Sequence, residues 1–180
     1  MPHYTYDFNP VAHITAGAVG EPGHRTFYVQ ATQGKQIVSV VCEKQQVAAL
    51  AEGIQRFLEE ITSKYPDRKT EEVIYSERAM ALIEPIAPAF RAGQMGLGYD
   101  DENDLLVLVI QEIVAEGDDA ENVEVARFWA SREQMLAMSR YATRIVVAGR
   151  PICGNCGQPI DPEGHFCPRR NGHPPIGYIP

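Results

Sequence analysis

The 180-residue sequence predicts an α+β fold: two pseudo-repeated units, each an antiparallel β-sheet plus a helix, followed by a small C-terminal module. Three observations predict it. Runs rich in β-branched and aromatic residues precede a helical pattern twice along the chain. Residues 16–20 and 92–96 share a glycine-rich pattern, and residues 41–50 align with residues 129–138. Three of the four cysteines then cluster after residue 150.

The first predicted unit covers about residues 10–62. Residues 26–31 and 36–42 have the composition of strands, and residues 32–35, which include Gly34, form the turn between them. A helix follows, because apolar residues recur at steps of three and four, which places them on one buried face. These residues are Val47, Leu50, Ile54, Phe57 and Ile61.

The second predicted unit covers about residues 89–149, with strands at 105–114 and 123–130. Residues 105–110 are continuously apolar, which predicts a strand covered on both faces. Ser131 and Gln134 have the spacing of a capping box, so a helix begins there. Its buried face is predicted from the same steps of three and four, at Met135, Met138, Ala142 and Ile145.

A connector over residues 63–88 joins the two units and contains three prolines, with one short helix expected near residues 76–83. Residues 93–98 hold three glycines, but their spacing is the reverse of a dinucleotide-binding fingerprint, and we expect a glycine-rich strand or turn. Pro151 ends the last long helix, since proline cannot continue it. The domains are therefore predicted as residues 1–150 and 151–180.

Composition restricts the function. The net charge of −8 disfavours a nucleic-acid partner, because affinity for phosphate backbones depends on Lys and Arg. No apolar run reaches the roughly 18 residues of a membrane helix. The N-terminus lacks the basic and apolar regions of a secretory signal, so we expect a cytoplasmic protein without a membrane partner. Clustered cysteines in such a chain indicate metal binding rather than disulfides.

The cysteine cluster predicts a zinc site. Cys153 and Cys156 form a Cys-x-x-Cys-Gly turn, and Cys167 follows before a proline. A structural zinc ion takes four nitrogen or sulfur ligands, so a histidine is needed as the fourth. Both His165 and His173 can reach, and spacing alone leaves both open. A redox dithiol is disfavoured, because such pairs begin a helix in a βαβ unit and this pair lies in a Gly/Pro-rich tail.

Outside the tail, we find no catalytic signature and predict no catalytic residue. Arg25, in the loop over residues 20–25, is a candidate to bind a phosphate or carboxylate; the alternative is an exposed arginine in a strand connection. Cys42 ends an apolar strand and is expected to be an inert buried thiol. A second metal site at His3, His13 and His24 is a weaker hypothesis.

Three segments together resemble a known family. They are residues 16–27, with Gln30-Ala31 and residues 43–47 after them; Phe90-Arg91-Ala92-Gly93; and the tail from Cys153 through Gly164-His165-x-Cys167-Pro168-Arg169 to Asn171-Gly172. The chain resembles the bacterial domain-of-unknown-function family 3090 along almost its whole length. In that family a histidine typically precedes the third cysteine, which favours His165. The residue after Asn-Gly is often tyrosine, and His173 departs from that pattern. The resemblance implies no activity.

Two functional hypotheses follow. The first is a cytoplasmic, non-catalytic binding or adaptor protein whose zinc ribbon-like tail contacts a protein partner. It is motivated by a closed metal site without a recognisable catalytic group. The second is an enzyme or sensor for a phosphorylated small molecule, with a pocket between the two repeats and Arg25 on the ligand.

Overall fold

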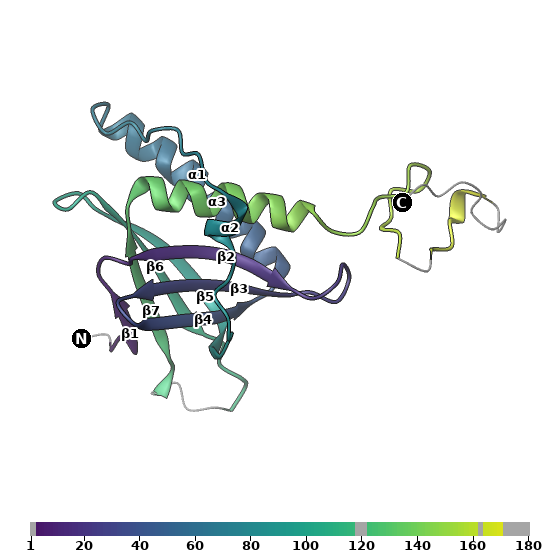
Figure 1. Cartoon of the computed structure of the whole chain (residues 1–180), viewed down its shortest axis with the longest axis horizontal. Helices are drawn as coiled ribbons and strands as arrows, with labels where there is room; N and C mark the ends of the chain where they lie inside the picture. Colours follow the sequence, from purple (N-terminus) through teal and green to yellow (C-terminus); the bar gives the residue numbers. More distant parts are fainter. Residues whose placement is uncertain (1–2, 118–121, 162–163, 171–180) are drawn as a thin grey trace.

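The computed structural model describes residues 3–117, 122–161 and 164–170, and shows an α+β fold built on one seven-stranded mixed sheet (Figure 1). The strand order is β1-β7-β6-β5-β4-β3-β2. The strands are β1 (Tyr6–Phe8), β2 (His13–Val19), β3 (Thr26–Gln33), β4 (Gln36–Cys42), β5 (Pro88–Asp100), β6 (Leu105–Glu112) and β7 (Val125–Ala130). The helices are α1 (Lys44–Lys64), α2 (Glu77–Met80), α3 (Arg132–Val147) and a short 3₁₀ turn, η2 (Pro168–Arg170).

The sheet differs from the two antiparallel sheets that we predicted. Strands β2 to β4 form one antiparallel meander and β5 to β7 form another, but β4 and β5 pair in parallel and merge the two. Strand β1 adds a second parallel pair, on β7. Joining them covers part of the backbone edge that each meander would otherwise expose, over residues 39–41 of β4 and 88–91 of β5. Local patterns along the chain cannot reveal the pairing of β4 with β5, because the paired residues are about fifty positions apart.

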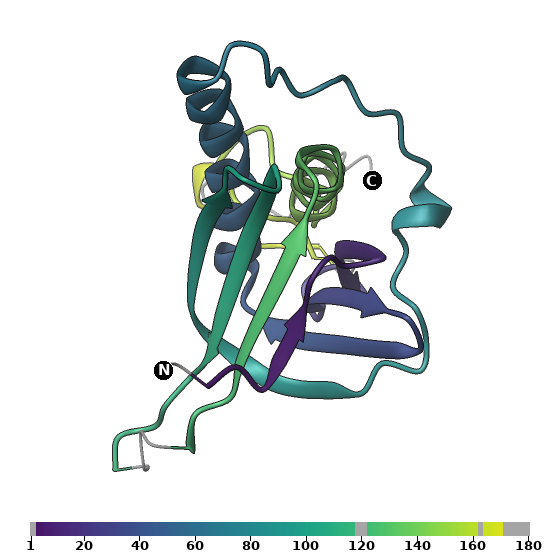
Figure 2. The same ribbon diagram turned by 90° about the vertical axis from the view of Figure 1, so that its left-hand side faces the viewer.

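Both long helices lie side by side against the concave face of the sheet (Figure 2). Helix α1 begins with a capping box between Glu43 and Gln46, and α3 begins with the predicted capping box between Ser131 and Gln134. The expected buried faces are confirmed for both helices, with Val47, Ile54, Met135 and Met138 among the most deeply buried. Phe57 and Ile145 are only partly buried.

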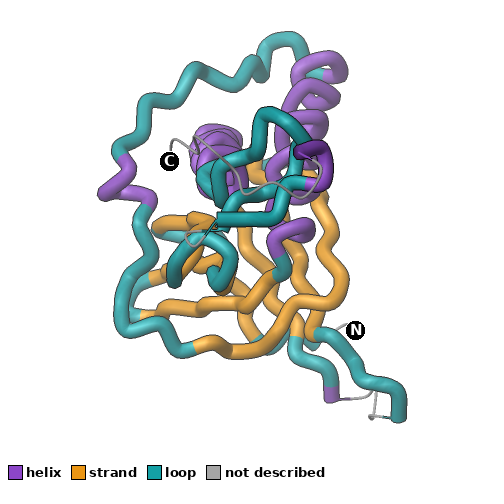
Figure 3. The backbone as a smooth tube through the Cα atoms, turned by 90° about the vertical axis from the view of Figure 1, so that its right-hand side faces the viewer, coloured by secondary structure: helices purple, strands orange, loops and turns teal. Residues whose placement is uncertain are grey.

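Two glycine-rich strands, β2 and β5, were not expected as full strands. Gly17 in β2 is needed because a Cβ there would meet the Leu82 side chain at 2.5 Å. Leu82 belongs to the connector, which crosses the outer face of the sheet (Figures 2 and 3). There the Thr15 hydroxyl donates to Met80 O at 2.6 Å, and Gln30 donates to Ile83 O at 3.1 Å. The expected short helix is α2, capped by Ser76.

A polar network holds the tip of the β5–β6 hairpin. Asp104 has a left-handed backbone (φ 54°) and accepts two hydrogen bonds from Arg132, each 2.9 Å long. The Tyr99 hydroxyl also donates to it at 2.6 Å. Burial raises the pKa of Asp104, but the bonds from Arg132 and Tyr99 outweigh that effect, and the pKa is lowered. The network joins the hairpin to the start of α3.

Among the described residues, none of the helices has both the length and the apolar character that crossing a bilayer requires.

Candidate metal centre

The C-terminal module begins with a tight turn that presents two thiols. The Gly157 N–H donates to Cys153 O at 2.8 Å, and the Cys153 N–H donates to Gln158 O at 2.8 Å. Gly157 has φ +71°, a conformation that glycine adopts without steric cost. Ile152 and Pro159 form an antiparallel bridge just outside the turn. The glycine of the Cys-x-x-Cys-Gly motif therefore lets both cysteine side chains face the same point.

Backbone N–H groups in this turn favour the thiolate form of Cys153. The N–H groups of Cys156 and Asn155 act on the Cys153 sulfur and lower the pKa of this thiol to about 6. At Cys156 the Gln158 N–H also lowers the pKa, but burial and the two neighbouring sulfurs outweigh it, so that pKa is raised. Since thiolates are the form that binds metal, the turn prepares one ligand in advance.

Four side chains converge in the module. The ligand atoms of Cys153, Cys156, His165 and Cys167 all lie within 4.8 Å of one another. The Cys153 and Cys167 sulfurs are 3.9 Å apart, and the Cys156 sulfur is 3.2 Å from His165 Nε2. Around a tetrahedral zinc ion with Zn–S of about 2.3 Å, two sulfurs lie about 3.8 Å apart. The donor set and its spacing therefore fit one zinc-sized ion.

The described part of the module extends beyond the end of α3 and consists of loops and the short η2 turn (Figures 1 and 3). Arg150 forms an ion pair with Asp161, 2.6 Å apart, which braces the segment that leads into the cysteine turn. The Arg150 side chain also lies against Gly23, where a Cβ would come within 3.3 Å of it. The loop over residues 20–25 thus contacts the base of the module. Sequence reasoning did not identify Arg150 or Asp161, since an isolated Arg and Asp carry no spacing signal.

A family model described as "Protein of unknown function (DUF3090)" matches residues 6–167. The chain belongs to this family. No curated protein and no solved structure matches the chain significantly. The match includes all four converging side chains and ends before His173. His173 lies outside the residues that the structure describes, so its geometry is not compared with that of His165.

In this DUF3090 protein, the candidate ligand residue Arg25 already has protein partners. Its Nη1 donates to Ile145 O near the C-terminal end of α3 at 2.8 Å, and its guanidinium lies 5.0 Å from the centre of the Phe27 ring. A cation at this end of a helix stabilises the exposed carbonyls and the dipole. Arg25 also lines a cavity of about 380 Å³ between β2, the connector and α3. Binding of an anion by Arg25 stays a prediction.

The other candidates of the DUF3090 chain do not form a second site. Within the described residues, the only group of three or more side chains that could hold a metal ion is the Cys₃His group. His3, His13 and His24 do not form such a group. Cys42 ends β4 and is buried, and burial raises the pKa of its thiol to about 12. The expectation of an inert thiol at Cys42 agrees with these values.

Proposed function

We propose that this protein binds one structural zinc ion through Cys153, Cys156, His165 and Cys167, and that it is a cytoplasmic, non-catalytic binding or adaptor protein. The convergence of the four ligand atoms within 4.8 Å carries the zinc proposal. Three thiolates and one imidazole would occupy all four coordination positions of a tetrahedral zinc ion and leave no position for a substrate. The ion would serve folding, because the described part of the module contributes nothing to the main hydrophobic core.

The exposed side chains of the module support the adaptor role. Ile152 and Phe166 are 62% and 65% exposed, next to the cysteines that the ion would fix in place. Large apolar residues on a small rigid support are typical of a contact surface for another protein. A zinc ribbon-like module of this kind would present them without a hydrophobic core of its own.

Metal analysis tests the zinc site. We expect purified protein to contain about one zinc per chain by mass spectrometry, and His165→Ala and Cys167→Ser to lose it on gel filtration. Cys42→Ser is the matched control and should keep the metal. Zinc retained in His165→Ala but lost in His173→Ala would move the fourth ligand to His173. A metal-free protein whose residues 152–167 still resist hydrogen exchange would refute the proposal.

A metabolite screen tests the non-catalytic role. We expect no hydrolase or transferase turnover with a broad panel of phosphorylated metabolites. Turnover that a single substitution in residues 1–150 abolishes would overturn this part of the proposal and leave the zinc site intact.

We further propose that two segments, about residues 10–62 and about residues 89–149, are copies of one ancestral unit. The connector joins the two copies. Each has three antiparallel strands followed at once by a helix with a glutamine capping box. Each also has a row of paired residues that ends just before the helix N-cap: Ala18–Phe27–Cys42 and Tyr99–Leu106–Ala130. The register supports the alignment of residues 41–50 with residues 129–138, a displacement of 88 positions. At the first strand it favours an alignment of Ala18 with Tyr99, 81 positions apart, over the alignment of residues 16–20 with residues 92–96, which are 76 positions apart.

The cavity of about 380 Å³ supports a second candidate function, a small-molecule sensor. It lies between β2 of the first unit, the connector and α3 of the second unit, as a pocket between repeats requires. Glu84 and the carbonyl end of α3 also line it, and they partly offset the charge of Arg25. A thermal-shift screen with nucleotides and sugar phosphates tests it. Stabilisation of the wild type that Arg25→Ala lacks would support this function, and no stabilisation would count against it.

A further inference from the structure

Strand β5 has an open backbone edge. Its first residues pair with β4, but that pairing stops at Val41↔Arg91, because β4 ends at Cys42 and the chain turns into α1. From there to Asp100, β5 pairs with β6 on its other side, and the described part of the chain places no strand beside this edge. In an antiparallel pair, alternate residues direct both N–H and C=O away from the partner. The edge therefore offers a row of unpaired backbone groups.

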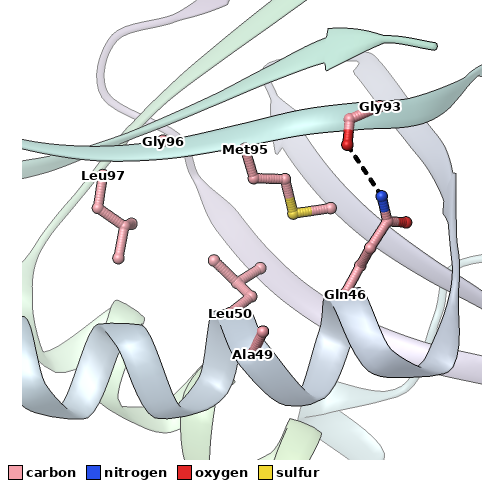
Figure 4. Close-up of a pocket in the computed structure, with 7 residues that line it drawn as sticks. All are labelled: Gln46, Ala49, Leu50, Gly93, Met95, Gly96 and Leu97. Carbon is pink, nitrogen blue, oxygen red and sulfur yellow. Dashed lines mark hydrogen bonds between the residues drawn. The ribbon is translucent and has the colours of Figure 1, made fainter.

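One side chain already uses the start of this edge. Gln46 Nε2 donates to Ala92 O at 3.2 Å. It also donates to Gly93 O at 3.0 Å, as Figure 4 shows. Its Oε1 is occupied by the N–H of Glu43 in the capping box. Gln46 thus acts as a substitute for the next residue of β4. Beyond Gly93, the described residues provide no further substitute of this kind.

Two hollows lie between α1 and this part of β5, and together we call them the groove. The hollow near Gln46 has a volume of about 270 Å³, and Leu50, Met95 and Leu97 point into it from opposite sides (Figure 4). A cavity of about 150 Å³ is enough for a benzene ring, so this space fits a large aliphatic or aromatic side chain. A second hollow of about 370 Å³ follows between the far half of α1 and the end of β5.

The two ends of the groove differ in charge. The first hollow is lined by apolar side chains and the Gln46 amide. The second is lined by Glu60, Asp101 and Lys64, an acidic excess on a chain with net charge −8. Met95 and Asp101 are six positions apart, about 20 Å along a strand. A complementary occupant is apolar at one end and basic about six residues away.

We propose that this groove binds an extended peptide segment of a partner protein by strand addition to β5. Antiparallel addition is favoured because that pairing is the more stable per residue. It places a large apolar side chain between Leu50 and Met95, and a Lys or Arg about six positions N-terminal to it beside Glu60 and Asp101. Backbone hydrogen bonds supply affinity and the two hollows supply specificity. The proposal rests on the binding role proposed above and gives the class of the partner, on a surface separate from the zinc module.

Fluorescence anisotropy with a designed peptide tests the proposal. The probe is fluorescein-labelled Arg-Thr-Val-Thr-Val-Thr-Leu with blocked termini, whose alternate side chains match the two hollows. We expect saturable binding. A peptide with proline for the second valine, which faces the open-edge residue Leu97, should bind at least tenfold more weakly, because proline cannot donate to the ladder. Absence of binding by the first peptide, or equal binding of both, would overturn the proposal.

Matched variants locate the peptide. Ala49 is exposed and lines the groove, so Ala49→Trp should weaken binding at least tenfold; Gln45→Trp, exposed on the same helix outside the groove, should not. Glu60→Lys should weaken the arginine peptide and strengthen one with glutamate in its place, whereas Glu59→Lys should do neither. Peptide affinity that is unchanged by both Ala49→Trp and Glu60→Lys would refute this location.

Two further readouts separate the alternatives. If Ala49→Trp converts an oligomer into a monomer in sedimentation experiments without peptide, a second copy of the chain fills the groove and the proposal is wrong. Zinc content is measured in every sample. Peptide binding by zinc-free Cys167→Ser would support the peptide-binding proposal independently of the metal. Zinc-loaded protein that does not bind the peptide would refute the peptide-binding proposal and leave the zinc proposal intact.

Discussion

At the scale of single residues, the chemistry of this protein depends on a few positions whose neighbours alter their properties. Cys153 and Cys42 are the same residue type, yet the pKa values of their thiols are about 6 and about 12. Backbone N–H groups around Cys153 stabilise the thiolate, whereas burial in the apolar core destabilises it at Cys42. The sequence motif predicted the first thiol as a metal ligand, and position at the end of a strand predicted the second as inert.

Asp104 gives a testable prediction at this scale. Its folded-state pKa is lowered by Arg132 and Tyr99, so it contributes stability above its unfolded pKa and loses that contribution as pH falls through the folded pKa. We expect Asp104→Asn to lower the free energy of unfolding by about 1 kcal/mol at pH 7, since the site is partly exposed and asparagine also accepts the left-handed backbone.

Urea unfolding at pH 7, 5, 4 and 3 measures this effect. The difference between wild type and Asp104→Asn should shrink as pH falls below 4, because Asp104 becomes protonated in the wild type too. Glu102→Gln, in the same turn and exposed, should change stability by less than about 0.5 kcal/mol. A difference between wild type and Asp104→Asn that grows in acid would contradict the sign.

At the scale of elements, the start of α3 was the most predictable feature. The Ser131–Gln134 pair identified the start of α3, and Arg132 is its first residue in the structure. The signal is local, because the N-cap hydroxyl and the third residue bond each other's backbone. Strands β2 and β5 were harder, because their glycines weaken the β-branched signal and are explained by contacts such as that between Gly17 and Leu82.

The capping box of α3 gives the second prediction. The Ser131 side chain accepts from the Gln134 N–H at 3.1 Å, and removing the acceptor leaves that donor without its cap. We expect Ser131→Ala to lower the free energy of unfolding by about 1 kcal/mol, measured by chemical denaturation followed by circular dichroism. Ser131→Asp, which retains an acceptor at the N-cap, should stay close to wild type. Equal losses in both variants would show that the cap is not the cause.

At the scale of the whole molecule, the body and the C-terminal module contain different kinds of contacts. The body has one apolar core between the sheet and the two long helices, and the described residues from Pro151 onward contribute nothing to it. The described part of the module has few regular hydrogen bonds and four converging side chains that could hold a metal ion. Its order should therefore depend on the ion and that of the body should not.

Chelation tests this division. When zinc is removed from the full-length protein, we expect residues 152–167 to exchange amide hydrogens rapidly, because the ligands lose the ion that holds them together. The core strands β3 and β6 should keep their protection, and the unfolding midpoint of the body should move by only a few degrees. Hydrogen exchange read by mass spectrometry, before and after a chelator and again after zinc is restored, measures both. Loss of protection in β6 would contradict the separation.

The sequence by itself determined the features that are encoded over short distances: the α+β class, the helix with a buried face after each set of strands, and a Cys-x-x-Cys-Gly turn followed by a third cysteine. Each depends on residues within about fifteen positions, whose periodicity or spacing is a direct consequence of backbone geometry. The family resemblance added His165 as the favoured fourth ligand.

Only the tertiary structure decided how these parts combine. The parallel pairing of β4 with β5 merges the two meanders into one sheet, and the end of β4 at Cys42 leaves the rest of the β5 edge open beside α1. The tertiary structure also places the Arg25 side chain at the C-terminal end of α3 and brings His165 to the three cysteine sulfurs. These contacts join residues far apart in the chain or depend on how loops close. They are set by packing and by the need to pair backbone groups, which no local pattern of residues records.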